Sequence, residues 1–390
     1  KTTFCRTSRT CRRRAPLPGM RILPDMDILS HRQMRLKKQI TNVILLMDSG
    51  HLQWNNPEGI MGARKTGGDM TFPAGEMGIA MVIQVKNLVK RYGDLTALDH
   101  LNLEIHEGEI FGLLGPNGSG KTTAINCILS LLKFDKGDIM IFGKPMSPDA
   151  YDIKRRIGIV MQNVAVFDEL TVYENIDYFC GLYITDKNTR KSLVEEAIEF
   201  VGLGDFRKFY PKKLSGGLLR RLNIACGIAH KPDLIILDEP TVAVDPQSRN
   251  SILEGILRLN SEGATVVYTS HYMEEVEQIC SRIAILDRGK IIAQGTKDEL
   301  KDMIRSGVTI EVELIGAPPS IERDVRDLPH ILSAELNGNM LVVKSEKGKS
   351  NLVMLLDYLK SRNIPLGRVY SEPPTLNDVF LEITGKELRD

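Results

Sequence analysis

The most informative stretch of this sequence is Gly115-Pro116-Asn117-Gly118-Ser119-Gly120-Lys121-Thr122-Thr123. It matches the pattern G-x-x-x-x-G-K-[ST] and lies between an apolar run at 109–114 and a helical pattern at 122–132. Glycines let the backbone wrap a phosphate with its N–H groups, and the following helix offers its N-terminus to the same anion. Lys121 adds a charge for the β- and γ-phosphates, and the Thr122 hydroxyl can ligate Mg²⁺. A glycine-rich turn with an incidental lysine would not need both flanking elements, so the stretch predicts a phosphate-binding loop.

Two carboxylates end another apolar run, which reads Leu234-Ile235-Ile236-Leu237-Asp238-Glu239. A strand buried on both faces would deliver Asp238 at its carboxyl end, beside the phosphate loop, where it can hold Mg²⁺ through water. Glu239 would lie just beyond, placed to orient or deprotonate an attacking water. Many strands end in a solvated Asp-Glu turn, so the pair is informative only because the phosphate loop accompanies it.

Two further features fit the same chemistry less specifically. His271 follows the next apolar run, at 265–269, from which it could reach a γ-phosphate, although a lone histidine at a strand end is more often structural. The string Leu214-Ser215-Gly216-Gly217 opens a helical pattern at 216–229, and helix N-terminal amides make a second anion site. A single nucleotide-binding domain has no evident need for two phosphate sites.

Short apolar runs alternate with helical patterns from Met81 to about Leu300. The runs read as buried parallel strands at 109–114, 157–161, 234–237, 265–269 and 283–286. This alternation predicts an α/β domain with a largely parallel sheet at 81–303.

Residues 304–390 predict a smaller α+β domain. The pattern gives a strand at 308–314, a helix at 320–328, a hairpin around the turn 337–339, a helix at 349–360, a strand near 368–370 and a helix capped by Thr375. The order βαββαβ-α suggests a ferredoxin-like sandwich.

Residues 1–80 show no sustained period and open with an Arg-rich start. Such an acid-poor opening would suit a transit peptide, but the simpler hypothesis is that this extension is non-native and that translation begins at Met81. It carries 13 Lys and Arg against 6 Asp and Glu, and the remaining residues carry 38 against 44. The folded part is therefore mildly acidic, which argues against nucleic acid as its main partner.

The six cysteines include no C-x-x-C pair, which excludes the usual zinc spacings and fits buried thiols in a reducing compartment. No run approaches the roughly 18 apolar residues that a spanning helix needs. A role at a membrane would therefore require another chain.

Taken together, the motifs resemble those of ABC-type ATPase subunits, in the family's order and over residues 82–300. Residues 115–123 resemble the Walker A motif, 234–239 the Walker B motif and 214–217 the signature motif. The resemblance also assigns family roles to four single residues: the switch histidine His271, the Q-loop glutamine Gln162, the adenine-stacking Tyr92 and the D-loop Asp245. It implies an α/β P-loop NTPase fold of ABC type with a helical signature subdomain, ATP hydrolysis, and Mg²⁺ near Thr122, Gln162 and Asp238.

The resemblance also implies partners. In this family two domains pack head to tail, and each ATP lies between the Walker motifs of one and the signature of the other. This chain has one motif set, so it should dimerise with itself or a close paralogue, with Ser215, Gly216 and Gly217 contacting the γ-phosphate held by the partner's Lys121. Closure would pass through residues 163–173 to a separate transmembrane permease subunit, from the cytoplasmic face of the cell membrane.

Some residues depart from the family or select a branch within it. Leu218 stands where glutamine is commonest, and the D-loop at 241–245 keeps only its aspartate, which puts communication between the two sites in doubt. Residues 372–380 resemble the ending of daunorubicin-resistance-type ATPases, which serve drug, polysaccharide and sodium export, although an ordinary capped helix explains the same residues. An importer ATPase is the first alternative, but its C-terminal domain tends to be longer and barrel-like. A soluble non-transport ABC protein is the second, but such proteins contain tandem nucleotide domains or coiled coils.

Overall fold

A computed structural model describes residues 80–348 and 351–385, so the expectations for residues 1–79 lie outside it. Its central sheet has six strands in the order β10-β9-β3-β8-β7-β6. Strands β9, β3, β8, β7 and β6 run parallel, and β10 joins β9 antiparallel. The bounds are β3 Ile110–Leu114, β6 Ile157–Val160, β7 Leu234–Asp238, β8 Thr265–Ser270, β9 Arg282–Asp287 and β10 Lys290–Thr296. The predicted α/β class is confirmed.

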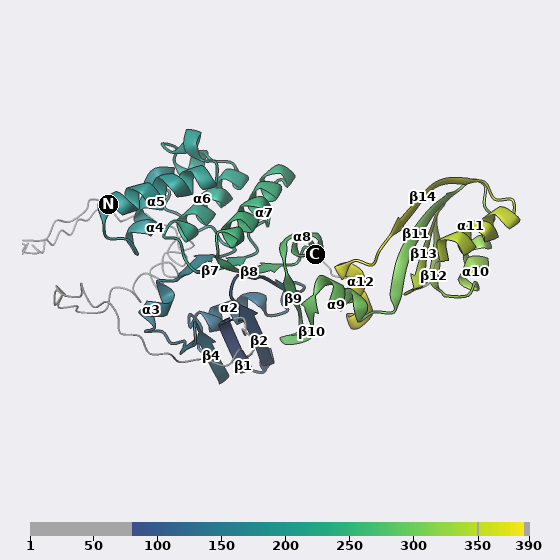
Figure 1. Cartoon of the computed structure of the whole chain (residues 1–390), viewed down its shortest axis with the longest axis horizontal. Coiled ribbons are helices and arrows are strands. Elements are labelled where there is room, and N and C mark those ends of the chain that lie inside the picture. Colours follow the sequence, from purple (N-terminus) through teal and green to yellow (C-terminus); the bar gives the residue numbers. More distant parts are fainter. Residues whose placement is uncertain (1–79, 349–350, 386–390) are drawn as a thin grey trace, which may run out of the picture. The chain divides into compact units, whose positions relative to one another are not determined.

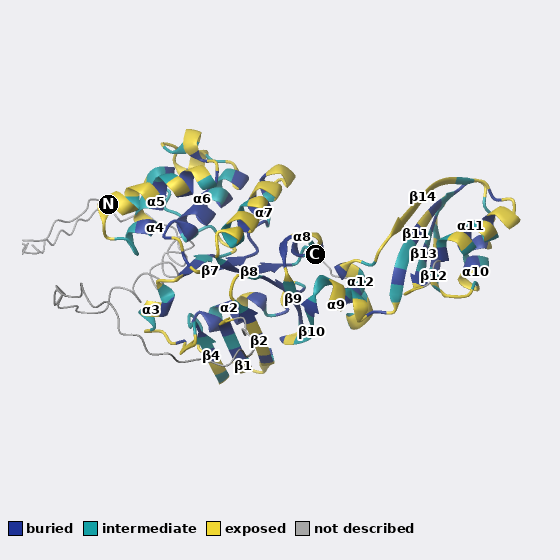
Figure 2. Cartoon of the chain, viewed as in Figure 1, coloured by how far each residue is buried: buried dark blue, intermediate teal, exposed yellow. Residues whose placement is uncertain are grey.

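The central strands are buried on both faces, which explains their continuous apolar runs. Every residue of β7 and β8 is buried (Figure 2). Alternate side chains enter different cores, since Leu234 and Ile236 pack in one cluster and Ile235 and Leu237 in the other. A strand with two apolar faces is held in a single register, because a slip by one residue would exchange the two sets.

One face of the sheet is covered by helix α2 (Lys121–Ile128) and a second, antiparallel sheet of order β2-β1-β4-β5. Its strands are β1 Met81–Tyr92, β2 Leu95–His106, β4 Lys136–Ile141 and β5 Lys144–Pro145. Only the first residues of this sheet were predicted as patterned sequence. Helix α2 is shorter than the helical pattern at 122–132 because the chain turns at Leu129 and Ser130 takes a φ of 53°.

Helices cover the opposite face. Figure 1 shows three helices side by side, α4 (Val172–Gly181), α5 (Lys187–Phe200) and α6 (Gly216–Ile228). These helices form the predicted helical subdomain. Their apolar residues share one cluster with α7 (Pro246–Ser261) and α8 (Met273–Ile279). Shorter elements are α3 (Tyr151–Lys154), α9 (Lys297–Asp302) and the 3₁₀ turns Gly204–Phe206 and Pro211–Lys213.

The C-terminal residues form an antiparallel sheet of order β12-β13-β11-β14 with its own apolar core. Its elements are β11 Ser306–Leu314, α10 Ile321–Arg326, β12 Ile331–Asn337, β13 Met340–Glu346, α11 Asn351–Ser361, β14 Leu366–Glu372 and α12 Leu376–Thr384. The order of elements and of strands is that of a ferredoxin-like fold followed by one helix. Thr375 and Asp378 form the capping box that starts α12. The domain boundaries at 80/81 and 303/304 stay predictions.

The last helix packs on the nucleotide-binding domain. Its buried residues Leu376, Val379 and Phe380 belong to the same apolar cluster as α8. The backbone N–H of Leu376 donates to Glu277 Oε2 at 3.4 Å, and Lys344 of β13 pairs with Asp378 at 2.7 Å. Residues 372–380, which resemble daunorubicin-resistance ATPases, therefore include the start of α12. This helix contacts both the nucleotide-binding domain and the C-terminal sheet.

Two sequence expectations concern the whole chain. Cys127, Cys180, Cys226 and Cys280 are buried free thiols, whereas Cys5 and Cys11 lie outside the described residues. In the part of the chain that the structure describes, no helix has the length and apolar character that a membrane crossing requires.

Candidate functional site

The sequence-predicted residues reach one edge of the central sheet because neighbouring strands end there. The phosphate loop follows β3, His271 follows β8, Asp238 ends β7, and Gln162 comes shortly after β6. These four strands are adjacent and parallel, so their carboxyl ends meet at the same edge.

The phosphate loop has the geometry that glycine permits. Gly118 has a φ of 80° and Gly120 a φ of 112°, and a Cβ on Gly115 would lie 2.2 Å from the carbonyl oxygen of Leu286. Lys121 Nζ donates to the carbonyl oxygens of Gly115 at 2.7 Å and Pro116 at 3.3 Å. Among the described residues, the buried Ser119 hydroxyl has no hydrogen-bond partner. A buried donor without a partner inside such a loop fits a phosphate oxygen.

Glu239 lies at the centre of what we call the carboxylate cluster, which consists of Lys121, Gln162, Glu239 and His271. One carboxylate oxygen lies 3.2 Å from Lys121 Nζ and 3.2 Å from His271 Nδ1. The other accepts a hydrogen bond from Gln162 Nε2 at 3.0 Å. Glu239 has a φ of 47°, in the left-handed region, so its main chain is held in a conformation that non-glycine residues rarely adopt.

Asp238 binds two hydroxyl groups. Its oxygens accept hydrogen bonds from Thr122 Oγ1 at 2.9 Å and Thr269 Oγ1 at 2.6 Å. The same Thr269 hydroxyl accepts from the Glu239 backbone N–H at 3.0 Å, so Thr269 holds the Asp238 carboxylate and the Glu239 main chain together. Thr269 was not singled out from the sequence, because β8 also contains Thr265 and Ser270 and nothing local distinguishes Thr269 from them.

The oxygen atoms of Thr122 and Asp238 fit Mg²⁺, which prefers hard oxygen ligands and is commonly bound by one or two protein groups together with substrate phosphates. Gln162, the third predicted ligand, binds Glu239 instead of these two oxygens.

A second group of predicted residues gathers at the start of α6, in what we call the signature turn, residues Ser215, Gly216 and Gly217. The Ser215 hydroxyl caps α6 by accepting from the Leu218 N–H at 3.3 Å. A Cβ on Gly217 would lie 2.9 Å from Asp245 Oδ2, so the signature turn and the D-loop aspartate are neighbours. Asp245 caps α7, and hydrogen bonds from Ser248 hold its pKa below its usual range.

The two groups do not meet within one chain. Across residues 80–348 and 351–385, no hydrogen bond or ion pair joins the signature turn to the phosphate loop or to the carboxylate cluster.

Tyr92 also stands apart from both groups. It ends β1 in the second sheet and is 49% exposed, and its ring centroid lies 5.0 Å from Lys90 Nζ. Its stacking on adenine stays a prediction.

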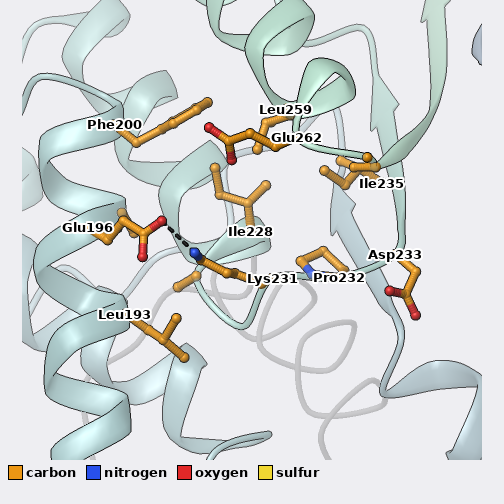
Figure 3. A pocket seen from close by; sticks show the side chains of 14 residues that line it. Leu193, Glu196, Phe200, Ile228, Lys231, Pro232, Asp233, Ile235, Leu259 and Glu262 are labelled. Atoms are coloured by element: carbon orange, nitrogen blue, oxygen red, sulfur yellow. Dashed lines mark ion pairs between the residues drawn. The ribbon is translucent and has the colours of Figure 1, made fainter. Parts of the chain in front are cut away.

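The pocket in Figure 3 lies elsewhere, between α5 and α7. Leu193, Phe200 and Leu259 give it an apolar lining, and the ion pair of Lys231 with Glu196, at 2.5 Å, crosses it. None of the predicted site residues lines it. It is a gap between helices of the α5–α7 layer, separate from the nucleotide chemistry.

Comparison with known proteins agrees with this geometry. The ABC transporter family matches residues 98–242, and the family described as "ATP-binding protein DrrA1-3-like, C-terminal domain" matches residues 295–384. The linearmycin resistance ATP-binding protein LnrL of Bacillus subtilis is 38% identical over 311 residues, which are 79% of this chain and 100% of that protein. The Nod factor export ATP-binding protein I of Burkholderia orbicola is 35% identical (79% and 98%), and the daunorubicin resistance ATP-binding protein DrrA3 of Streptomyces coeruleorubidus is 34% identical (79% and 97%).

Solved structures with the same fold include nucleotide-binding cassettes. A dimeric post-hydrolysis state of the cassette MJ0796 bound to ADP and Pi matches with a TM-score of 0.51 and 29% identity, over 55% of this chain and 98% of that one. Another dimeric MJ0796 structure matches with a TM-score of 0.51 and 30% identity, over the same shares. The chain is therefore an ATPase that belongs to the family of ABC transporter ATP-binding proteins, in the branch of export ATPases with a DrrA-type C-terminal domain.

Proposed function

We propose that two copies of this chain, or one copy and a close paralogue, pack head to tail around two ATP molecules and drive export through a separate transmembrane permease. The names of the relatives describe resistance to linearmycin and daunorubicin and export of Nod factor, and solved relatives form dimers. The chain itself would lie at the cytoplasmic face of the membrane, held there by the permease.

One observation carries the dimer proposal. The chain holds two anion-binding groups, the phosphate loop with its carboxylate cluster and the signature turn, and no polar contact joins them in the described residues. Head-to-tail pairing gives the second group a use, because the signature turn of one copy would then complete the nucleotide site of the other. Two-fold symmetric pairing forms both sites at once.

The contacts of Lys121 suggest how ATP changes the site. The Lys121 ammonium binds two carbonyl oxygens and the Glu239 carboxylate. Phosphate oxygens would take over this ammonium, because a multiply charged anion attracts it more strongly than one carboxylate does. Glu239 would then be free to accept the proton of the attacking water, still oriented by Gln162 and His271. Mg²⁺ bound near Thr122 and Asp238 would neutralise part of the negative charge of the β- and γ-phosphates.

The segment after Gln162 is suited to pass this change to a membrane subunit. The side chain of Asn175 in α4 is buried. Its Oδ1 accepts from the backbone N–H of Phe167 at 2.8 Å, and its Nδ2 donates to the carbonyl oxygens of Phe167 and Leu170 at 3.0 Å each. Residues 163–173 are therefore attached to α4, so a displacement of Gln162 would move a connected block.

The test is ATP-driven dimerisation of the Glu239→Gln variant, measured by light scattering on a sizing column. We expect this variant to bind ATP, to hydrolyse it at least about 100-fold more slowly than the wild type, and to elute as a dimer only with ATP. Adding Ser215→Arg should abolish the dimer and leave ATP binding intact, whereas Ser361→Arg, an exposed serine of the C-terminal domain, should have no effect. Persistent monomers of Glu239→Gln in ATP, also with the co-expressed membrane subunit present, would refute the proposal.

A further inference from the structure

Arg220 lies on α6, shortly after the signature turn, and its side chain is only 3% exposed. All of its N–H donors point to main-chain carbonyl oxygens. Nε donates to Pro240 at 2.7 Å, Nη1 to Met161 and Gln162 at 2.9 Å each, and Nη2 to Asp238 at 3.2 Å and Glu239 at 2.8 Å.

This set of partners is unusual for a buried arginine. No carboxylate group forms an ion pair with Arg220 among the described residues, although buried charges are generally paired. Burial lowers its pKa to about 10, while the negative charges of Asp238 and Glu239 act in the opposite direction, so the guanidinium stays charged at neutral pH. A planar fork with five donors can bind five carbonyl groups, and a lysine ammonium with three donors cannot.

The carbonyl groups come from the two strand ends that carry the predicted chemistry. Met161 and Gln162 follow β6, and Asp238 to Pro240 end and follow β7. The side chains of Gln162 and Glu239 are hydrogen-bonded to each other, with Gln162 Nε2 donating to Glu239 Oε2 at 3.0 Å. Arg220 thus holds the peptide groups behind both side chains, including the peptide that leaves Glu239 in its left-handed conformation.

We propose that Arg220 is a positioning residue that links the signature helix to the Gln162 and Glu239 main chain of its own protomer, so that contact of the signature turn with the partner's nucleotide adjusts the local hydrolytic site. The inference rests on the proposed head-to-tail dimer. Helix α6 is the physical connection, because its first turn bears Ser215 and Gly217 and its next turn bears Arg220. A displacement of α6 on dimer closure is carried to both strand ends through five hydrogen bonds. Each site would therefore respond to occupation of the other.

The experiment compares the full-length wild type with Arg220→Lys, and measures ATPase kcat and KM, affinity for a fluorescent ATP analogue, and melting temperature. We expect kcat to fall about 10- to 100-fold, because lysine cannot hold both strand ends and a small misplacement of catalytic groups costs about this much. The affinity for the analogue should change by less than about three-fold, because the phosphate loop is untouched.

Two controls separate positioning from folding. Leu222→Ala removes a buried side chain from the same helix without touching the carbonyl groups, and should lower the melting temperature while kcat of the folded protein is kept. Arg221→Lys tests the neighbouring arginine, whose bond to the Ser248 hydroxyl is long, at 3.4 Å. If Arg220→Lys behaves like these two controls, with kcat retained, the inference is wrong.

A double variant tests the path of action. Because Arg220 is proposed to position both Gln162 and Glu239, Arg220→Lys combined with Gln162→Ala should lose less rate than the product of the two single losses; rate losses that multiply in full would mean independent effects and would overturn the inference. Failure here is distinguishable from failure of the proposed function. In the first case the wild type hydrolyses ATP and Glu239→Gln dimerises, and in the second case one of these does not occur.

Discussion

Two adjacent glycines of the signature turn should respond oppositely to the same added methyl group. A Cβ on Gly217 would lie 2.3 Å from Ser248 Oγ and 2.9 Å from Asp245 Oδ2, so the start of α7 must move to admit it. A Cβ on Gly216 would meet only the Ala243 carbonyl oxygen, at an ordinary 3.7 Å. Gly217→Ala should therefore destabilise the fold, and Gly216→Ala should not.

The expected magnitudes follow from two terms. Overpacking costs about 1–3 kcal/mol, and replacing a helical glycine with alanine stabilises by about 0.5–1 kcal/mol. Gly217→Ala should thus lose up to about 2.5 kcal/mol, whereas Gly216→Ala should gain about 0.5–1 kcal/mol. At about 2–4 °C per kcal/mol for a domain of this size, the melting temperature of Gly217→Ala should fall by up to about 10 °C and that of Gly216→Ala should rise by about 1–4 °C.

The assay has two stages. Thermal melts of the nucleotide-free single variants measure the fold, and light scattering of both variants in the Glu239→Gln background with ATP measures dimerisation. Gly216 is exposed in the protomer. In the proposed dimer the methyl group of Gly216→Ala would face the partner's nucleotide, and we expect a weakened dimer from a protomer that is more stable. If Gly217→Ala melts at or above Gly216→Ala, the close packing of the signature turn on α7 is not as described. If Gly216→Ala forms the ATP dimer as readily as its parent, the signature turn does not contact the partner's nucleotide closely.

Lys121→Ala should weaken ATP binding about 10- to 100-fold, because it deletes a charge-assisted contact to phosphate. The control Lys144→Ala removes a lysine of the exposed ion pair with Asp152 and should bind ATP as the wild type does. Equal affinities of the two variants for a fluorescent ATP analogue would contradict the phosphate-loop assignment. His230 is buried and stacked on Tyr183 with ring centroids 3.8 Å apart, and burial lowers its pKa to about 4 because the charged imidazolium is disfavoured. The unfolded chain takes up this proton below about pH 6.5, and the folded chain does so only near pH 4. The free energy of unfolding should therefore decrease as the pH is lowered from about 6.5 to about 4, by up to about 1.4 kcal/mol per pH unit. His230→Phe keeps a ring against Tyr183 and should flatten that part of the dependence of the melting temperature on pH; an unchanged slope would show that His230 is not responsible.

The closeness of Asp238, Glu239 and His271 was predictable because it follows from strand order. Parallel strands buried on both faces are readable as apolar runs, and whatever follows their carboxyl ends meets at one edge. Asp238, Glu239 and His271 were placed in this way without any knowledge of the remaining contacts. Gln162 was found by resemblance, because a glutamine after a strand has no chemical signature of its own.

Arg220 and Thr269 were not predictable in the same sense. Arg220 is one of two adjacent arginines in a helical pattern, and nothing local distinguishes it from the exposed arginines that most helices carry. Its role depends on which carbonyl groups two distant strand ends present, which is a property of tertiary structure. The second sheet was also missed in large part, since β1 pairs with β2 through several register shifts that break the simple alternation of strand residues.

The ion pair between Lys121 and Glu239 bears on the order of events in the proposed hydrolysis. Both groups are buried, and their charged atoms lie 3.2 Å apart, so each compensates the charge of the other. Separating them without a replacement would leave two uncompensated charges, which costs several kcal/mol. In the proposed reaction, a phosphate of ATP would replace Glu239 as the partner of Lys121, and the released carboxylate would then accept a proton from water. On this proposal Glu239 would be available as a general base only when a substrate phosphate is bound, and Arg220 would hold its main chain in place during the exchange.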